Sequence, residues 1–368
     1  MATDRLPRPR AEVLAQILDS PEVSALISDL DATRWTGRRG YPIRTMIGVC
    51  LVKSIYAIPV WTRTISFISE HDVVKSILGC MRDSDVPSID ACYRFTAKLI
   101  RHAPALGDCL NAVVARLKDE NPKLGTNIAI DASDMPAYAN GQRYAYNGGP
   151  ERERFSDPDA TWGHRSAVST RSAGSYYGYK IHAAVCADTG LPLAWNIQTA
   201  KTNESTQVEP LLDVLSARHI APATCAMDKG YDIERIYAGC SDRQIAAVVP
   251  LRATPAVKRG VEHAPICEHG EWAFAGADYG RKATKWRCPE CTPGSKWIKA
   301  DRLHPLIPRD SERWRKLYRG RGAVEREFGN LKHKWGLGPL RVRKMERVRL
   351  HADLTMLARL GSALAASD

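Results

Sequence analysis

The sequence lacks any long uncharged apolar run, and this absence argues against export and membrane insertion. Residues 1–10 are polar and rich in proline, and no apolar stretch typical of a secretory signal follows them. The most apolar window, residues 43–60, contains Arg44 and Lys53 and is too interrupted to cross a bilayer. We therefore expect no membrane partner, and we interpret this window as a buried helix.

A disulfide framework is also missing. Apart from three cysteines between positions 267 and 291, the remaining seven of the ten stand singly among apolar residues, as at Cys50, Cys80 and Cys186. In a chain without a signal peptide, such cysteines are expected to be free thiols in the core. The sequence thus predicts reduced cysteines rather than disulfides.

Acidic residues are in the minority, with 41 Asp and Glu against 53 Lys and Arg, which gives a formal charge of +12 and a pI near 9.3. This balance favours a polyanionic partner, nucleic acid first. It does not identify one, because many basic proteins bind no nucleic acid specifically. With 368 residues, 44% of them hydrophobic and 26% charged, the chain is expected to fold into roughly two or three domains.

The first 120 residues show helical periodicity, with apolar residues spaced by three and four positions and prolines at the breaks. The expected helices cover residues 11–18, 22–30, 43–56, 61–67, 72–78 and 88–117, with a break near Pro104. Ser88 occupies an N-cap position, and Arg94 follows on the helix that it starts. We expect residues 1–120 to form a helical domain for DNA binding or assembly, with Arg94 on a phosphate. A solvated face of a structural bundle is the alternative for any one basic residue.

After residue 125 the pattern changes to short apolar runs, two of which end on an acidic residue. Strands are expected at 127–133, 176–187, 191–199, 224–228 and 244–250, and helices at 206–215 and 233–240. Residues 135–173 are dense in Gly, Pro, Asp and Ser and are expected to form a loop. This order predicts a mixed α/β sheet flanked by helices. We assign it to residues 121–254 and 309–368, interrupted by an insertion at 255–308 and closed by a helix at 348–365.

One helix in the second part combines a core-facing stripe with a row of polar side chains. Wound at about 100° per residue, residues 318–332 place Tyr318, Arg321, Glu325 and Lys332 roughly within a 60° sector. The apolar stripe beside that sector is made by Leu317, Val324, Phe328, Leu331 and Trp335. Such a row suits a phosphodiester and a metal ion, and the alternative is a solvated basic helix with incidental acids.

Two glycines affect where this helix can begin, and a second glutamate raises the question of which acid is functional. Gly320 and Gly322 each cost a helix interior about 1 kcal/mol relative to alanine, so the helix can begin as late as Gly322. Glu327 lies on the opposite side of the helix from Lys332. We therefore take Glu325 as the functional acid.

Three acids, Asp131 and Asp228 at strand ends and Glu325 on the helix, can meet only through the fold. Carboxylates brought together repel one another and need a cation, and their oxygen atoms suit Mg²⁺ or Mn²⁺. Two such ions, roughly 3.5–4 Å apart, can promote an in-line phosphoryl displacement. A turn or helix-cap role is the alternative for an isolated strand-end Asp. Asp134 and Asp232 rank second, because each lies beyond its strand end.

Four segments together resemble a known family. Tyr318, Arg321, Glu325 and Lys332 match the Tyr-Arg-Glu-Lys signature of bacterial insertion-sequence DDE transposases, in the group called insertion sequence four-like. Ile-Asp-Ala-Ser at 130–133 resembles that family's first catalytic strand and Met-Asp-Lys-Gly-Tyr-Asp at 227–232 its second. Tyr-Gly-Tyr-Lys-Ile-His at 177–182 resembles the strand between them. The resemblance covers about residues 125–250 and 310–360.

The resemblance implies a ribonuclease H-like catalytic domain that cuts DNA at transposon ends and joins the freed 3′ hydroxyl to a target. It implies that Asp131, Asp228 and Glu325 are the catalytic acids and bind two Mg²⁺ or Mn²⁺ ions. The implied DNA contacts come from Tyr318, Arg321 and Lys332, and from Lys180, His182, Lys229 and Tyr231 in the resembling segments.

A DNA-bound homodimer, in the bacterial cytoplasm with the nucleoid, is implied as well. The alternatives are a metal-dependent nuclease of similar fold and a non-catalytic DNA-binding protein derived from a transposase.

The insertion carries a pattern outside this signature: Cys267 and His269 form a CxH pair, and Cys288 and Cys291 form a CxxC pair. Together they can make a tetrahedral Cys₃His zinc site of the structural type, and free loop cysteines are the alternative. Trp272, Trp286 and Trp297 lie among basic residues and can either stack on a base or pack the insertion itself. The loop 152–171 and the basic run 341–349 are further candidates for contact with a DNA backbone.

Overall fold

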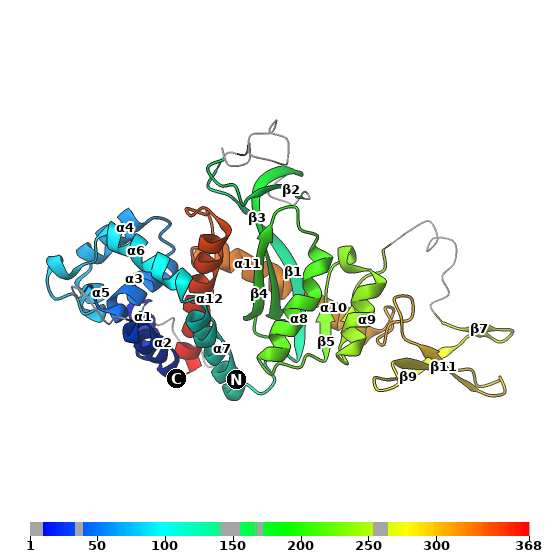
Figure 1. Ribbon diagram of the computed structural model, residues 1–368. Helices are drawn as coiled ribbons and strands as arrows, with labels where there is room; N and C mark the ends of the chain where they lie inside the picture. The colour runs from blue at the N-terminus through cyan, green and yellow to red at the C-terminus, as the bar shows by residue number, and fades with distance from the viewer. Residues whose placement is uncertain are drawn as a thin grey trace.

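The computed structural model describes residues 10–33, 40–139, 141, 155–165, 167, 172–252 and 264–367 of the chain. A bundle of helices, a mixed sheet and a small insertion follow one another, and the last helix returns to the bundle (Figure 1). Of the loop predicted to contact DNA, residues 152–154, 166 and 168–171 lie outside the described part of the chain.

The helices predicted in the first 120 residues are all found. They are α1 (Arg10–Asp19), α2 (Pro21–Ala32), α3 (Ile43–Ile55), α4 (Trp61–Glu70), α5 (Asp72–Ile77), α6 (Ile89–Arg101) and α7 (Ala103–Glu120). Ser88 Oγ caps α6 by accepting a 3.2 Å hydrogen bond from the backbone N–H of Ala91. The break before α7 comes at His102, and Pro104 lies in the first turn of α7, where its missing N–H is not needed.

The C-terminal helix α12 (Met345–Ser367) packs against α1, α3, α6 and α7, and it also contacts strand β4 (Pro192–Thr199). Figure 1 shows this helix, in red, between the N-terminal bundle and the sheet. Trp195 Nε1 donates a 2.7 Å hydrogen bond to Asp353 Oδ1 and so ties β4 to α12. One hydrophobic core therefore runs from the bundle through α12 into the sheet. Neither α12 nor any other described helix is long and apolar enough to cross a membrane.

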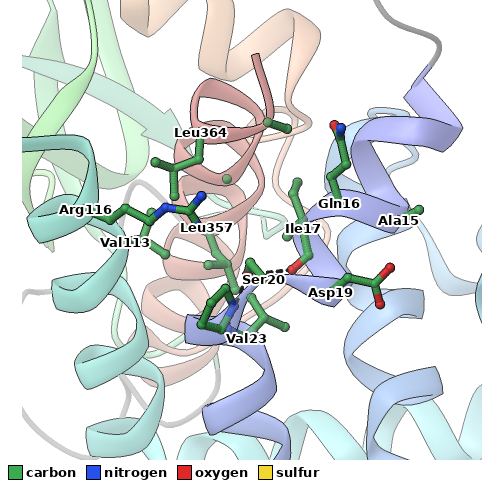
Figure 2. Close-up of a pocket in the computed structure, with 13 residues that line it drawn as sticks. Ala15, Gln16, Ile17, Asp19, Ser20, Val23, Val113, Arg116, Leu357 and Leu364 are labelled. Carbon is green, nitrogen blue, oxygen red and sulfur yellow. Dashed lines mark hydrogen bonds between the residues drawn. The ribbon is translucent and has the colours of Figure 1, made fainter. Parts of the chain in front are cut away.

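A cavity of about 480 Å³ lies where α12 meets α1, α2 and α7, and Figure 2 shows side chains from these helices around it. Arg116 of α7 pairs with Glu22 of α2 at 3.7 Å and with Glu120 at 3.1 Å. Ile17 and Leu357 contribute apolar wall from α1 and α12. The cavity is thus part of the packing between the bundle and α12.

The sheet has β1 (Asn127–Pro136) at its centre. Its order is β2-β3-β1-β5-β6, and β4 also pairs with β3; the further strands are β2 (Thr161–Arg165), β3 (Gly174–Cys186), β5 (Thr224–Ala226) and β6 (Ala246–Val248). β1 is antiparallel to β3 and parallel to β5, and β5 is parallel to β6. Helices α8 (Val208–Ala217) and α9 (Glu234–Asp242) pack on its strands. The predicted mixed α/β sheet is confirmed.

The predicted loop at 135–173 is wrong in two places. β1 continues to Pro136, and β2 lies inside the predicted loop, where its five residues pair with Gly174–Gly178 of β3. Trp162, Gly163 and His164 have no alternating apolar pattern of their own. Their strand conformation comes from pairing with a distant strand, which a local pattern cannot reveal.

The insertion also contains more regular structure than its sequence suggests. Its strands are β7 (Ile266–Cys267), β8 (Gly270–Glu271), β9 (Ala273–Asp278), β10 (Ala283–Arg287) and β11 (Ser295–Lys299). β7 and β8 form a hairpin, and β9, β10 and β11 form an antiparallel sheet. Trp286 is buried against Phe274, whereas Trp297 is 41% exposed. The ring of Trp286 therefore packs the insertion, and the ring of Trp297 remains accessible.

Two helices follow the insertion, α10 (Glu312–Arg319) and α11 (Gly322–Lys334), with a break at Gly320 and Arg321. The inference that the functional helix can begin as late as Gly322 is confirmed. The predicted apolar stripe is buried at Val324, Phe328 and Leu331. Because α11 packs against β1 and β3, the polar row beside this stripe lies next to the centre of the sheet.

Candidate active site

The candidate active site lies where β1, β5 and the start of α11 meet. Ala129 of β1 pairs with Ala226 of the parallel strand β5, and Asp131 and Asp228 each follow their paired residue by two positions. The two acids therefore lie at the same level of the sheet, on neighbouring chains. Asp228 stands just beyond the end of β5, where its Oδ1 accepts a 2.7 Å hydrogen bond from the backbone N–H of Gly230.

Arg321 connects the strand to the helix. Its Nη1 donates to Asp131 Oδ2 at 3.2 Å, and its Nη2 donates to Glu325 Oε1 at 2.6 Å. Arg321 lies in the break before α11, one turn before Glu325, which orients both side chains toward the sheet. The structure thus brings Asp131 and Glu325 to one guanidinium; the helical phase predicts that Arg321 and Glu325 lie on the same side, whereas the contact with Asp131 comes from the fold.

The carboxylate of Asp131, whose side chain is 18% exposed, is poorly compensated for a mostly enclosed group. Burial raises its pKa to about 7, and the backbone N–H of Ala132 and the guanidinium of Arg321 only partly oppose this effect. The negative charges of Asp228 and Glu204 raise the pKa of Asp131 further. A carboxylate in these surroundings is stabilised by additional positive charge.

Two of the three predicted acids, Asp131 and Glu325, pair with Arg321, and Asp228 lies near enough for its charge to raise the pKa of Asp131. The Cys/His cluster of the insertion does form a compact group, because its four ligand atoms all lie within 4.8 Å of one another. Among the described residues, the three acids form no such group. Glu325 is also 56% exposed at its side chain. Joint coordination of an ion by Asp131, Asp228 and Glu325 therefore requires that Arg321 move away and that the three carboxylates approach one another.

A fourth acid, Glu204, was not foreseen from the sequence. It begins a short 3-10 turn, η3 (Glu204–Gln207), that packs against the turn η4 (Lys229–Tyr231) after Asp228. Glu204 Oε1 accepts a 2.8 Å hydrogen bond from Lys180 Nζ, and its charge raises the pKa of Asp131. Nothing in the sequence around Glu204 distinguishes it from an ordinary first-turn acid, so only the fold reveals its position.

Lys332 lies on the same side of α11 and is held by β1. Its Nζ donates to Ser133 Oγ at 2.7 Å, to the Asp134 carbonyl at 2.6 Å and to Asp134 Oδ1 at 3.4 Å. Arg165 of β2 reaches the other oxygen of Asp134 at 3.5 Å. Asp134, which ranks second among the candidate acids, thus pairs with Lys332 and Arg165 beside the site.

The remaining predicted DNA-binding residues divide by exposure. Lys229 and Arg94 are exposed, and Tyr318 is half-buried with its ring stacked on Trp314 at 4.9 Å between centroids. His182 and Tyr231 are each 1% exposed, and the ring nitrogens of the first and the hydroxyl of the second lack hydrogen-bond partners. In this structure neither of these two side chains is accessible to DNA.

The two competing acids that sequence reasoning set aside have structural partners. Asp232 is fully buried at its side chain and lies 3.3 Å from Arg302 and 3.8 Å from Arg309. Glu327 is 2% exposed and accepts a 2.7 Å hydrogen bond from Arg359 of α12. Each acid therefore fixes one segment of the chain to another instead of facing the site around Arg321.

The Cys/His pattern of the insertion forms a compact group. Cys267 Sγ lies 3.7 Å from Cys288 Sγ and 3.9 Å from His269 Nδ1, and Cys291 Sγ lies 3.6 Å from His269 Nδ1. All four ligand atoms are within 4.8 Å of one another. The other ring nitrogen, Nε2, is 3.8 Å from carboxylate oxygens of Glu268 and Glu290, which favours Nδ1 as the free ligand atom.

The rest of the cysteine prediction also holds. All ten cysteines are free, and the seven outside the insertion are buried in the core.

A protein-family profile described as "Transposase DDE domain" matches residues 123–360. No curated protein sequence matches the chain. A solved structure that aligns is the cryo-EM structure of a piggyBac transposase synaptic complex with hairpin DNA, at 12% sequence identity and a TM-score of 0.40, over 97% of this chain and 74% of that one. At so low a TM-score the two chains are not shown to share a fold.

Proposed function

Since the chain belongs to the family of transposases with a DDE domain, we propose that it binds transposon-end DNA and catalyses metal-dependent strand cleavage and strand transfer. The freed 3′ hydroxyl is joined to a target, which makes the reaction a DNA transposition. Asp131, Asp228 and Glu325 are the proposed catalytic acids.

The observation that carries this proposal is the pairing of Arg321 with Asp131 and Glu325, at 3.2 Å and 2.6 Å. Residues far apart in the sequence are thereby gathered around one positive charge. Asp228 lies close enough for its own charge to raise the pKa of Asp131. Phosphoryl transfer depends on such preorganised charge, because negative charge must be stabilised on the attacking and leaving oxygens.

The donor set fits a hard divalent cation. Asp131, Asp228 and Glu325 offer only carboxylate oxygens, which Mg²⁺ and Mn²⁺ prefer, and the raised pKa of Asp131 indicates too little positive charge around it. We propose that these three residues hold two such ions when Arg321 has moved aside. Bound there, the ions would activate the attacking oxygen and stabilise the leaving one.

The basic residues of α11 act on the substrate. Arg321 exchanges Asp131 and Glu325 for a DNA phosphate, which a guanidinium can bind with two hydrogen bonds. Lys332, held by Ser133 and Asp134, presents its ammonium beside the scissile phosphate. Tyr318, Lys229 and Lys180 border the same region. His182 and Tyr231 are buried in this structure, so they would reach DNA only after a rearrangement.

We also propose a ribonuclease H-like catalytic domain of the insertion sequence four-like group. Supporting it are the central strand that carries Asp131, the antiparallel strand β3 beside it and the parallel strands β5 and β6 on its other side. The spacing of Tyr318, Arg321, Glu325 and Lys332 supports the group.

The cluster of Cys267, His269, Cys288 and Cys291 is proposed to bind a structural Zn²⁺. A tetrahedral ion with Zn–S bonds of about 2.3 Å and Zn–N bonds of about 2.0–2.1 Å separates its ligand atoms by roughly 3.5–3.8 Å. The contacts of 3.6, 3.7 and 3.9 Å agree with this spacing. Four protein ligands leave no open position, so the ion stabilises the insertion and takes no part in the reaction.

The proposed partners are transposon-end and target DNA and a second copy of the chain on that DNA, in the bacterial cytoplasm with the nucleoid. Residues 1–120, with Arg94 exposed on α6, are proposed to contribute DNA binding or assembly. The family and the positive charge of +12 support the DNA partner.

A strand-transfer assay with Mg²⁺ and the inverted repeats of the element tests this function. Joined product, lost in Asp131→Asn, is the expected result. Nicking without joining would favour the metal-dependent nuclease, and a mobility shift without cutting would favour a non-catalytic DNA-binding protein.

A further inference from the structure

A second pocket, of about 470 Å³, opens between the N-terminal bundle and α12, away from the acids around Arg321. Its wall comes from α3, α4, α6 and α12, from Tyr138 just after β1, and from Arg341–Arg343 just before α12. The pocket therefore lies where the chain leaving the strand of Asp131 and the chain leaving α11 both meet the bundle.

Lys53 of α3 lines this pocket and is a charged group with no counter-charge. It is 8% exposed, and in the described part of the chain its ammonium makes no hydrogen bond or ion pair. Its Nζ lies 5.6 Å from the ring centroid of Trp61, a contact that stabilises a cation only weakly. Burial lowers the pKa of Lys53 to about 8. Buried lysines are normally paired, so this one is available to a ligand.

The rim of the pocket adds more positive charge. Four arginines line it and one carboxylate opposes them; these are Arg101, Arg341, Arg343 and Arg347, with Glu346 as the acid. All five are exposed. His351 at the base stays neutral, because burial lowers its pKa to about 3. With Lys53 the pocket has five cations against one anion, which is a strong field for a negatively charged ligand.

Tyr138 fixes two of these arginines. The guanidinium carbons of Arg341 and Arg343 each lie 4.9 Å from the centroid of its ring. Arg343 Nε also donates a 2.8 Å hydrogen bond to the Tyr138 carbonyl. Tyr138 thus holds both guanidinium groups at the edge of the pocket, and no carboxylate of the described residues pairs with either of them, so both are free to bind phosphate oxygens.

We propose that this pocket binds a backbone phosphate of DNA, with the Lys53 ammonium at its base and the arginines at its rim. The inference rests on the proposed function, since it assumes a DNA partner, and it adds a contact outside the catalytic acids. Phosphate is favoured over a carboxylate ligand because it offers more oxygens to several cations at once.

The distance to the catalytic acids suits one continuous duplex. Tyr138 follows Asp131 by seven residues, and a fully extended chain of that length spans at most about 25 Å. Each base pair advances the duplex axis by about 3.4 Å. Asp131 and Tyr138 are therefore separated by no more than the length of about seven base pairs, so one duplex is long enough to extend past both.

The test compares the full-length protein with Lys53→Met and with Lys123→Met, an exposed lysine outside the pocket. Two probes are used: inorganic phosphate, at ionic strength matched with chloride, and a 30-base-pair duplex titrated at several salt concentrations. Lys53→Met should weaken phosphate binding roughly tenfold or more and reduce the salt slope of duplex binding by about 1. Lys123→Met should change neither. Without ligand, Lys53→Met should melt no lower than the wild type, because it removes an unpaired buried charge.

If phosphate binding is lost but the salt slope of the duplex is unchanged, a free phosphate compound is the ligand and the DNA assignment is overturned. If both are unchanged, the whole proposal is overturned. Arg101→Gln, a change at the exposed rim, gives a second measurement should Lys53→Met fail to fold, and it too should weaken phosphate binding.

The experiment also distinguishes a failure of the proposed function from a failure of the pocket proposal. A wild-type protein that binds no duplex at all would contradict that function, while the phosphate titration would still report on the pocket. A protein that cleaves DNA normally but shows no effect of Lys53→Met would contradict the pocket alone.

Discussion

The guanidinium of Arg321 donates a 3.2 Å hydrogen bond to Asp131, a residue 190 positions earlier in the chain. The same group donates to Glu325. Arg321 therefore supplies positive charge to two acids of the site. In the function proposed above, a metal ion would replace Arg321 as the counter-charge of these carboxylates, and a DNA phosphate would replace the carboxylates as the partner of Arg321.

Replacing this cation should make stability depend on divalent metal. Arg321→Met removes the cation that pairs with the mostly enclosed Asp131, and we expect a loss of about 1–3 kcal/mol in EDTA. Mg²⁺ should restore most of that loss, because it binds the same carboxylates. Thermal melts with and without Mg²⁺ measure the effect. Arg319→Met, an exposed residue on α10, is the control and should show no such dependence.

Removing a catalytic carboxylate should stop the chemistry and spare DNA binding. Asp131→Asn and Glu325→Gln are each expected to lower the cleavage rate roughly 100-fold or more. Binding of the duplex should change little, since neither change removes a cation. Cleavage of labelled transposon ends and a mobility shift on the same duplex measure the two properties, and cleavage retained by either variant would show that the site is assigned incorrectly.

Two glutamates on α11 should separate catalysis from stability. Glu327→Gln removes the buried carboxylate that pairs with the partly exposed Arg359 of α12, and breaking a pair with a buried member costs up to about 3–5 kcal/mol. Glu325→Gln, two positions away and 56% exposed, should change the free energy of unfolding by less than about 1 kcal/mol. Denaturant titration measures both. Equal losses of stability would contradict the different surroundings of these residues.

The insertion should contain one zinc ion per chain. Metal analysis of purified protein is expected to find that ion in the wild type and to lose it in Cys288→Ser or Cys291→Ser. Cys92→Ala, a buried thiol on α6, is the matched control and should retain the metal. Chelation should also expose the insertion to protease. A protein that is folded, purified with zinc present and still free of metal would refute the site.

Phosphate binding at Lys53 should weaken with rising pH. The pKa of this lysine is lowered from 10.5 to about 8, so the free protein loses the charge above about pH 8. The affinity for phosphate is therefore expected to fall as pH rises through that value, while Lys53→Met shows no such fall. Calorimetry at pH 7 and at pH 9 provides the comparison.

The stability of the free protein should depend on pH in the opposite direction and increase as pH rises. Between about pH 8 and pH 10.5 the unfolded chain keeps a proton on Lys53 that the folded protein has released, so stability rises with pH in that window. The charged and titratable groups that line the pocket with Lys53 are Cys50 on its own helix, Tyr93 and Arg101 on α6, Tyr138 after β1, and Arg341, Arg343, Glu346, Arg347 and His351 in or before α12. The arginines remain charged throughout, and they therefore do not produce the change.

Sequence reasoning recovered those parts of the fold that local pattern determines. The seven N-terminal helices, the break at Gly320 and Arg321 and the phase that separates Glu325 from Glu327 follow from spacing within a few residues. The Cys/His cluster was also predictable, because its four members fall in two short motifs.

Features made by distant contacts were not predictable. Strand β2 has no pattern of its own and exists through pairing with β3. Glu204 resembles any first-turn acid until η3 packs beside the turn that follows Asp228. The sequence indicates Lys53 only as a charged residue that interrupts an apolar helix, because residues almost 300 positions later complete its pocket.

The position of α12 has a consequence for how the chain is made. This helix fills the space among α1, α3, α6 and α7, although more than two hundred residues separate it from them. During synthesis the early helices emerge first, yet the apolar faces that α12 covers stay open until α12 has left the ribosome. A nascent chain therefore depends on slow closure of a very long loop, and the helices α1 to α7 are exposed to chaperones and proteases until then.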